Sequence, residues 1–326
     1  MSPLRCLFRH IAPAALLLLG ALAIAQEYPS RLIRIVVPFP AGGSTDIYAR
    51  IIANDLQTTF GLSVIIDNRA GGTGIIGAQS VRQAQPDGHT LLFTSNTGHV
   101  LGSLLQEPRP FDAVGDFTPI AVAIRFPNYL VINPAIPART LAEFVAYAKL
   151  RPKKLNYSSS GQGSYSHIAG EILNAAAGID AVHLPYKGAA PALQAVIGGE
   201  AQFRFDNVGT SQPFVVAGKL RGLAVTGVKR AQAIADIPTM TEAGINGFDG
   251  VYTWLGLLGP AHLPPAIVSR LSAEVARIMH LPEIAKRVLN DGYEVVESTP
   301  AQFRNDMQTE MLASMRMIRE RGIRAE

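Results

Sequence analysis

The stretch Leu32-Ile-Arg-Ile-Val-Val-Pro-Phe-Pro-Ala-Gly-Gly-Ser-Thr-Asp46 sets the fold class, because it joins a strand to a helix through a loop of small residues. Residues 32–38 form an apolar run of the kind found in buried parallel strands. Residues 46–58 carry apolar side chains at helical spacing, and Thr45 or Asp46 is the expected N-cap. A strand, a glycine-rich loop and a helix in this order predict the first unit of an α/β fold.

The alternation of strand and helix continues beyond this first unit. Further strands are predicted at 64–67, 90–95, 119–132, 155–159 and 181–184, and further helices at 75–85, 140–150, 167–177 and 188–197. The part from Trp254 onward is predicted to be helical, over 265–279, 281–289 and 300–320. This order favours a mostly parallel sheet. The length of 326 residues favours two domains, with 124–226 as the second and 26–123 plus 227–326 as the first.

The first 25 residues have the pattern of a signal peptide. Arg5 and Arg9 form a basic region, residues 11–24 are apolar, and Ala23-Ile-Ala25 fits a cleavage site of small residues. The apolar run is shorter than the roughly 20 residues that a membrane-spanning helix needs. We therefore expect residues 1–25 to be removed and the mature protein to be periplasmic.

Composition argues against several classes of protein. Removal of residues 1–25 lowers the formal net charge from +4 to +2, which is no nucleic-acid footprint. Cys6 is the only cysteine and leaves with the signal peptide, so the mature chain has no disulfide and no thiolate chemistry. The seven histidines show no metal-ligand spacing. We expect no metal and no cofactor.

Four loops of Gly, Ser and Thr lie where a strand is expected to lead into a helix, at residues 39–46, 68–74, 95–99 and 158–167. A helix N-terminus leaves unpaired N–H groups and a partial positive charge, and small side chains let an anion approach both. Several such termini together would hold a carboxylate. Because these loops contain no evident nucleophile–base pair, the pattern predicts a receptor rather than an enzyme.

The order of the motifs resembles a known family. The matching segments are 36–46, 68–78, Pro86-Asp-Gly88, 159–164 with 167–171, Pro185-Tyr-Lys-Gly188, Phe205-Asp-Asn207 and 218–226. Together they resemble the solute receptors of tripartite tricarboxylate transporters, often called the Bug family, over nearly all of the mature chain. The resemblance implies a two-lobed periplasmic binding protein of the type II, flytrap-like kind. It also implies a small organic acid as ligand, bound between the lobes, and membrane permease subunits as partners. We expect a monomer.

The resemblance and the loop pattern select the same candidate ligand-binding residues. In the first lobe these are Phe39, Ala41, Gly42, Gly43, Ser44, Thr45, Asp46, Gly72, Thr73, Ser95 and Thr97. In the second lobe they are Ser160, Gly163, Ser164, Ser166, His167 and Asp206. Their backbone N–H groups and hydroxyls would bind a carboxylate, directly or through water. No catalytic residue is expected.

Some of these assignments leave two roles open. Asp46 either caps its helix or also contacts ligand. Asp206 either recognises a ligand amine or hydroxyl, or fixes the backbone of its own loop. Tyr165 stands where the family often has proline, and Asn96-Thr-Gly98 replaces a more usual Ser-Thr pairing, so ligand identity is not transferred from a relative.

Three other classes compete with a transport receptor. Gly72-Thr-Gly-Ile-Ile-Gly77 matches the dinucleotide fingerprint G-x-G-x-x-G, but no strand ends in an acidic residue about 20 positions later. A secreted hydrolase lacks support because the nucleophile elbow G-x-S-x-G is absent. A ligand sensor for a membrane signalling partner would have the same cleft and differ only in the partner.

Overall fold

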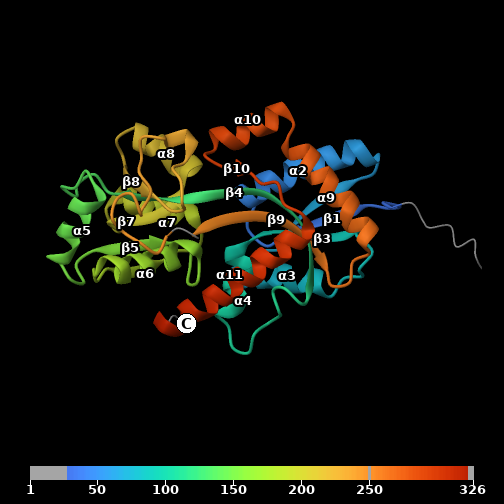
Figure 1. The fold of residues 1–326 in the computed structure, drawn as a ribbon, viewed down its shortest axis with the longest axis horizontal. Coiled ribbons are helices and arrows are strands. Elements are labelled where there is room, and N and C mark those ends of the chain that lie inside the picture. Colours follow the sequence, from blue (N-terminus) through green and yellow to red (C-terminus); the bar gives the residue numbers. More distant parts are fainter. Residues whose placement is uncertain (1–27, 249–250, 322–326) are drawn as a thin grey trace, which may run out of the picture.

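The computed structural model describes residues 28–248 and 251–321, which fold into two lobes joined by long strands (Figure 1). The predicted signal peptide, residues 1–25, lies outside the described residues. Within the described ranges, no helix has both the length and the apolar character that a membrane crossing requires.

The first lobe is a sheet covered by helices on both faces. Its strands are β1 (Ile33–Val37), β2 (Val64–Asn68), β3 (Thr90–Ser95), β9 (Tyr252–Pro260) and β10 (Glu294–Val295). On one face lie α2 (Ser44–Phe60), α9 (Pro265–Met279) and α10 (Pro282–Asn290), whose buried side chains pack with Ile35 and Phe93. The other face carries η1 (Gly72–Gly74), α3 (Ile75–Arg82), η2 (Thr97–Leu101), α4 (Gly102–Leu104) and α11 (Pro300–Arg321).

The second lobe repeats this design on a smaller scale. Its strands are β5 (Asn156–Ser159), β6 (Val182–Pro185), β7 (Phe203–Asn207) and β8 (Arg221–Val225). The helices α5 (Leu141–Lys149) and α6 (Tyr165–Ala177) pack with Phe203 and Phe205. On the opposite face, α7 (Ala189–Gly198) and α8 (Val208–Val216) pack with Tyr129 and Val131.

One strand, β4 (Phe117–Ile132), belongs to both lobes (Figure 1). It pairs with β9 as far as the Pro127–Tyr252 position, and from Asn128 onward it pairs with β7 and β8. The main strand order is β2-β1-β3-β9-β4-β7-β5-β6, so a single sheet runs through the molecule. The two-lobed α/β fold expected from the sequence is confirmed.

The centre of this sheet differs from the expected parallel arrangement. The outer strands β1 to β3 and β5 to β7 pair in parallel, as expected, whereas β9 runs antiparallel to β3 and β4, and β4 runs antiparallel to β7 and β8. The prediction that the chain is helical from Trp254 onward is wrong at its start, because Trp254 lies inside β9. This segment is short and apolar, contains aromatic residues and ends in glycine and proline, which is typical of a strand. The sequence interpretation wrongly extended the helical pattern of the following segments back over it. The three helices expected after it are present.

The chain between β8 and β9 packs with the second lobe. Ala231 and Ile234, in and beside η3 (Gln232–Ile234), join the core of β4 and α7, while Met240 and Phe248 join the core of β7 and α6. We therefore propose that the second lobe extends from the expected end at 226 to about residue 248, since residues that share a core fold together.

Candidate functional site

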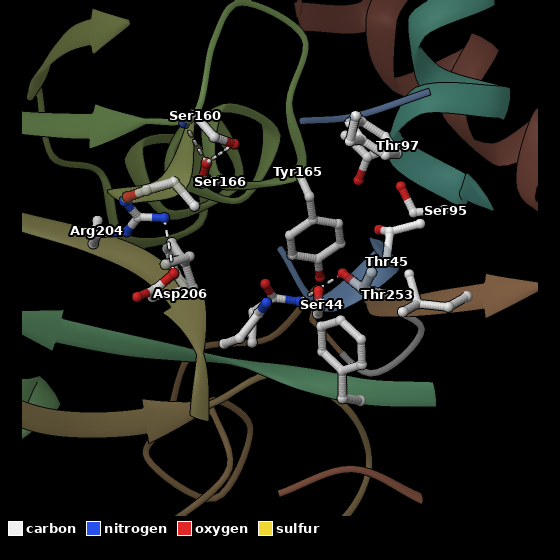
Figure 2. Close-up of a pocket in the computed structure, with 17 residues that line it drawn as sticks. Ser44, Thr45, Ser95, Thr97, Ser160, Tyr165, Ser166, Arg204, Asp206 and Thr253 are labelled. Carbon is white, nitrogen blue, oxygen red and sulfur yellow. Dashed lines mark hydrogen bonds and ion pairs between the residues drawn. The ribbon is translucent and has the colours of Figure 1, made fainter. Parts of the chain in front are cut away.

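A pocket of about 140 Å³ lies between the lobes, where β4 and β9 pass from one to the other. Figure 2 shows Ser160, Ser166, Arg204 and Asp206 on one side of Tyr165, with Thr45, Ser95 and Thr97 on the other. The lining residues are Phe39, Ser44, Thr45, Ser95, Thr97, Phe126, Asn128, Ser160, Tyr165, Ser166, Ala189, Arg204, Phe205, Asp206, Asn207, Thr253 and Leu255. The pocket is thus rich in hydroxyl and amide groups supplied by both lobes.

Helix N-termini from both lobes border this pocket. Helix α2 begins directly after Gly43 and places Ser44 and Thr45 in its first turn at the pocket wall. From the second lobe, α6 begins after its N-cap Ser164, and α8 begins after Asn207. Because such ends carry unpaired N–H groups and partial positive charge, anionic groups are favoured at both walls.

The floor of the pocket is formed where the lobes join. Asn128 on β4 accepts a hydrogen bond from the Thr226 backbone N–H through its carbonyl, at 2.8 Å, and its amide side chain donates to the Thr253 hydroxyl at 3.1 Å. The Thr226 hydroxyl in turn donates to the Val251 carbonyl at 2.6 Å. Polar groups of β4, of β9 and of the residue that follows β8 are therefore bonded to one another at the pocket floor, which holds this floor in place.

The structure brings part of the expected site together and leaves part outside. Expected residues that line the pocket are Phe39, Ser44, Thr45, Ser95, Thr97, Ser160, Ser166 and Asp206. Expected residues that do not line it are Ala41, Gly42, Gly43, Asp46, Gly72, Thr73, Gly163, Ser164 and His167. Most of the second group shape the loops that carry the first group.

Asp46 organises the first loop. Its carboxylate accepts hydrogen bonds from the Gly42 N–H and from Arg50, each at 3.0 Å, and from the Asn68 amide at 3.0 Å. Burial by itself would raise the pKa of Asp46, but these hydrogen bonds lower it overall, so the group stays ionised. The expectation that Thr45 or Asp46 is the N-cap is wrong, because α2 begins at Ser44 after the N-cap Gly43, and both residues lie in its first turn. With its oxygens occupied and its side chain away from the pocket lining, Asp46 fixes the loop before α2.

His167 organises the second-lobe loop in a similar way. Its Nδ1 accepts a hydrogen bond from the Gly163 N–H at 3.0 Å, and its ring stacks on His183 with centroids 3.9 Å apart. Burial lowers the pKa of His167, so the neutral form that can accept this bond is favoured. Ser164 caps α6 by accepting from the His167 N–H, and the Ser166 hydroxyl accepts from the Ser160 N–H at 3.1 Å.

Gly72 and Thr73 support the pocket from behind. Both have positive φ, at 56° and 54°, and they form the short turn η1 ahead of α3. A Cβ at Gly98 would lie 3.1 Å from the Thr73 carbonyl and 2.6 Å from the Phe39 ring. The glycine-rich turn therefore packs against η2 and, through it, against a pocket residue.

Several pocket residues were not among the candidates selected from the sequence. They are Phe126, Asn128, Tyr165, Ala189, Arg204, Phe205, Asn207, Thr253 and Leu255. Thr253 and Leu255 lie on the strand that the sequence pattern assigned to the start of a helical region. Arg204 could have been noticed, because a charged residue inside the short apolar strand Phe203-Arg-Phe-Asp-Asn207 requires a partner.

Arg204 and Asp206 form a buried ion pair in the pocket wall. Arg204 Nη2 donates to Asp206 Oδ1 at 2.9 Å, and both side chains are almost fully buried. Desolvation raises the pKa of Asp206 and lowers that of Arg204, and each partner's charge opposes the shift of the other. Asp206 also accepts from the Thr210 hydroxyl at 3.0 Å, which corresponds to the loop-fixing role considered for it from the sequence.

A third acid, Glu310 of α11, lies directly behind the pocket wall. Its carboxylate accepts hydrogen bonds from the Asn96 amide at 2.7 Å and from the Trp254 indole N–H at 2.8 Å. Asn96 lies between the pocket residues Ser95 and Thr97. Desolvation raises the pKa of Glu310 to about 7, despite the two hydrogen bonds that lower it.

Glu310 is expected to make stability depend on pH. Because its folded-state pKa of about 7 exceeds the usual 4.5, the folded chain keeps a proton that the unfolded chain loses between these values. The free energy of unfolding should therefore fall as pH rises from 4.5 to 7. For a fully buried carboxyl group, a pKa difference of this size would change the free energy of unfolding by about 3 kcal/mol. We expect a change of about 1–2 kcal/mol, because Glu310 as a whole residue is partly exposed.

Urea unfolding at pH 5 and pH 7.5 measures this effect. The Glu310→Gln variant should lose that part of the pH dependence, whereas Glu283→Gln, on the exposed surface of α10, should keep the wild-type dependence. An unchanged pH dependence in Glu310→Gln would contradict the assignment.

Comparisons with known proteins agree with this geometry. BugT of Bordetella pertussis is 30% identical over 91% of this chain and 91% of its own length. A structure described as R. palustris Rpa4515 with adipate matches with a TM-score of 0.85 and 32% identity, covering 91% of this chain and 99% of the other. MatC (Rpa3494) from Rhodopseudomonas palustris with bound malate matches with a TM-score of 0.81 and 31% identity, covering 89% and 100%.

The family comparison covers most of the chain. The sequence profile described as "Tripartite tricarboxylate transporter family receptor" matches residues 48–323. This range begins inside α2, so it leaves out β1 and the pocket residues Phe39, Ser44 and Thr45. It includes the second lobe, the rest of the first lobe and all the other pocket-lining residues. The chain therefore belongs to the tripartite tricarboxylate transporter family receptors, the Bug family of solute-binding proteins.

Proposed function

We propose that this protein is a periplasmic receptor that binds a small organic carboxylate between its lobes and delivers it to a tripartite tricarboxylate-type membrane permease. The observation that carries the proposal is the pocket itself, in which α2 and α6 begin on opposite sides among hydroxyl and amide groups. Such groups stabilise an anion without transforming it. The relatives solved with adipate and malate support a carboxylate as the ligand.

Binding without catalysis is part of the same proposal. Among the described residues that line the pocket, serine and threonine hydroxyls occur without a histidine or lysine that would act as base. Delivery to a permease, a monomeric state and the absence of a cofactor are further parts of the proposal, and the family match supports the first of them. The proposal includes export through a signal peptide over residues 1–25, which the sequence pattern supports. A ligand that contacts both lobes would favour the closed arrangement of the lobes, in which both walls of the pocket contact it.

A thermal-shift screen of the mature, refolded chain tests the proposal. A carboxylate present at a hundredfold excess over its Kd should stabilise the protein by about 2.7 kcal/mol, whereas the corresponding neutral amides should not. Thr45→Val should weaken carboxylate binding about tenfold, because it removes a hydroxyl that can bond a charged group. Stabilisation by neutral compounds alone would contradict the proposal.

Thr58→Val is the matched control for this experiment. Thr58 lies on the same helix, α2, but its hydroxyl bonds the Asn54 carbonyl at 3.1 Å on the exposed surface. This variant should bind carboxylates like the wild type. A loss of binding equal to that of Thr45→Val would show that α2 is being perturbed as a whole and would remove Thr45 from the site.

A further inference from the structure

Arg204 is the one cation among the described residues that line the pocket. It lies on β7, beside β4, and only 2% of it is exposed. Side chains alternate along a strand, so Arg204 and Asp206 extend from the same face of β7, toward α7 and α8. A buried arginine in a ligand pocket requires an explanation, because burial of a charge is costly unless the charge is paired and hydrogen-bonded.

The hydrogen bonds of Arg204 are incomplete. A guanidinium has five N–H donors. Within the described residues, Nη2 donates to Asp206 at 2.9 Å and Nη1 donates to the Ala189 carbonyl at 2.9 Å, while the buried Nε has no acceptor. Unpaired donors in a buried cation leave a preference for an additional oxygen acceptor, above all an anionic one.

Asp206, in contrast, is occupied. Its Oδ1 accepts from Arg204, its Oδ2 accepts from Thr210 at 3.0 Å, and it also accepts from the backbone N–H of Asn207. It therefore has little capacity left for a ligand amine, which was one of the two roles considered for it. Its carboxylate neutralises Arg204 and fixes the plane of the guanidinium, so Asp206 is a positioning residue.

The opposite wall supplies donors of its own. Ser44 and Thr45, in the first turn of α2, face the pocket from the first lobe, whereas Arg204, Ser160 and Ser166 face it from the second. A ligand that satisfies both walls has an acceptor group at each end. The cavity of about 140 Å³ is close in size to one that holds benzene, so the group between the two ends must be short.

We propose that Arg204 is a specificity-determining residue that recognises the second carboxylate of a compact dicarboxylate, with Asp206 as its positioning residue. The inference rests on the proposed function, because it names which carboxylates the receptor selects. Succinate and butyrate are suitable probes, since they share a four-carbon chain and differ by one carboxylate.

Isothermal titration calorimetry of succinate and butyrate tests the role of Arg204. Arg204→Met alone would leave Asp206 buried without its cation, so the double variant Arg204→Met/Asp206→Asn is the informative protein. Wild type should bind succinate more tightly than butyrate. The double variant should bind succinate about 10- to 100-fold more weakly, because the loss of charge-assisted hydrogen bonds has an effect of this size. Its affinity for butyrate should change by less than about threefold.

Asp206→Asn alone separates positioning from direct contact. It should weaken succinate binding less than the double variant and should not affect butyrate. Arg221→Met is the matched control, because Arg221 is a partly buried arginine of the same lobe that bonds the Ile136 and Ala138 carbonyls outside the pocket. It should keep the wild-type ratio of the two affinities.

Four outcomes of these titrations separate the role of Arg204 from the proposed function. A folded double variant, checked by circular dichroism, that keeps the wild-type succinate-to-butyrate ratio would overturn the role of Arg204. Equal loss of both ligands in that variant would overturn it too, by showing a purely structural effect. Equal binding of both ligands by wild type would overturn the dicarboxylate preference while the carboxylate receptor stands. Absence of any carboxylate binding by wild type would remove the proposed function itself.

Discussion

Replacing Asp206 by alanine is expected to lower the free energy of unfolding by about 3–5 kcal/mol. The change leaves the Arg204 guanidinium, which is 2% exposed, without the carboxylate that it bonds at 2.9 Å. Little water can replace that partner, because both side chains are almost fully buried and border only the small pocket between the lobes. Thr210 loses its acceptor as well. Urea denaturation of the mature chain measures the effect.

Two further variants define the cause of this loss. Arg204→Met/Asp206→Asn removes both charges, so it should recover most of the lost stability if the cost comes from an uncompensated charge. Asp236→Ala, on the exposed surface, should change stability by less than about 0.5 kcal/mol. A loss below about 1 kcal/mol for Asp206→Ala would mean that water reaches Arg204 and that the pair is not truly enclosed.

Gly77→Ala is expected to destabilise the first lobe by about 2–3 kcal/mol. Gly77 is the last glycine of the G-x-G-x-x-G match and lies in α3. A Cβ there would lie 2.7 Å from Pro38 Cβ, 2.9 Å from Pro38 Cα and 3.1 Å from the Arg69 carbonyl. Two of these atoms belong to the backbone and do not rotate away, so α3 must shift from the end of β1. Thermal unfolding measures the loss.

The same variant should also weaken ligand binding, because Pro38 precedes the pocket residue Phe39. Gly198→Ala is the matched control, since Gly198 lies at the exposed end of α7 and an added methyl group there would meet no atom within 4 Å. It should be neutral or raise stability by up to about 1 kcal/mol, because alanine is the better helix former. Equal destabilisation by both variants would show that the packing on Pro38 carries no special cost.

The glycines at 72, 74 and 77 have structural roles that account for their spacing. From the sequence they match a dinucleotide fingerprint. In the structure they let η1 turn with positive φ, let α3 approach β1 and let η2 approach η1. The chemical requirement for glycine is the same in both cases, a close backbone approach, which explains why the spacing alone does not identify a ligand.

Local sequence was sufficient to predict most of the secondary structure and the loops that surround the pocket. Apolar runs and helical periodicity are local properties, so β1, α2 and α9 could be predicted from neighbouring residues. Small residues ahead of helices identified the loops that carry Ser44, Thr45, Ser160 and Ser166 to the pocket. The capping residues and the ligand-facing residues of these loops could not be separated, because both need small polar side chains.

The centre of the molecule, in contrast, depends on tertiary contacts. β9 enters the sheet between β3 and β4 although it is far from both in sequence, and this antiparallel pairing brings Thr253 and Leu255 to the pocket. The burial of Arg204 and its bond to Asp206 likewise depend on how β7 and α7 come together. The pairing partners of a strand and the burial of a side chain are set by contacts between distant segments, which no local sequence pattern encodes. The strand order and the Arg204–Asp206 pair in the pocket wall could therefore be identified only from the tertiary structure.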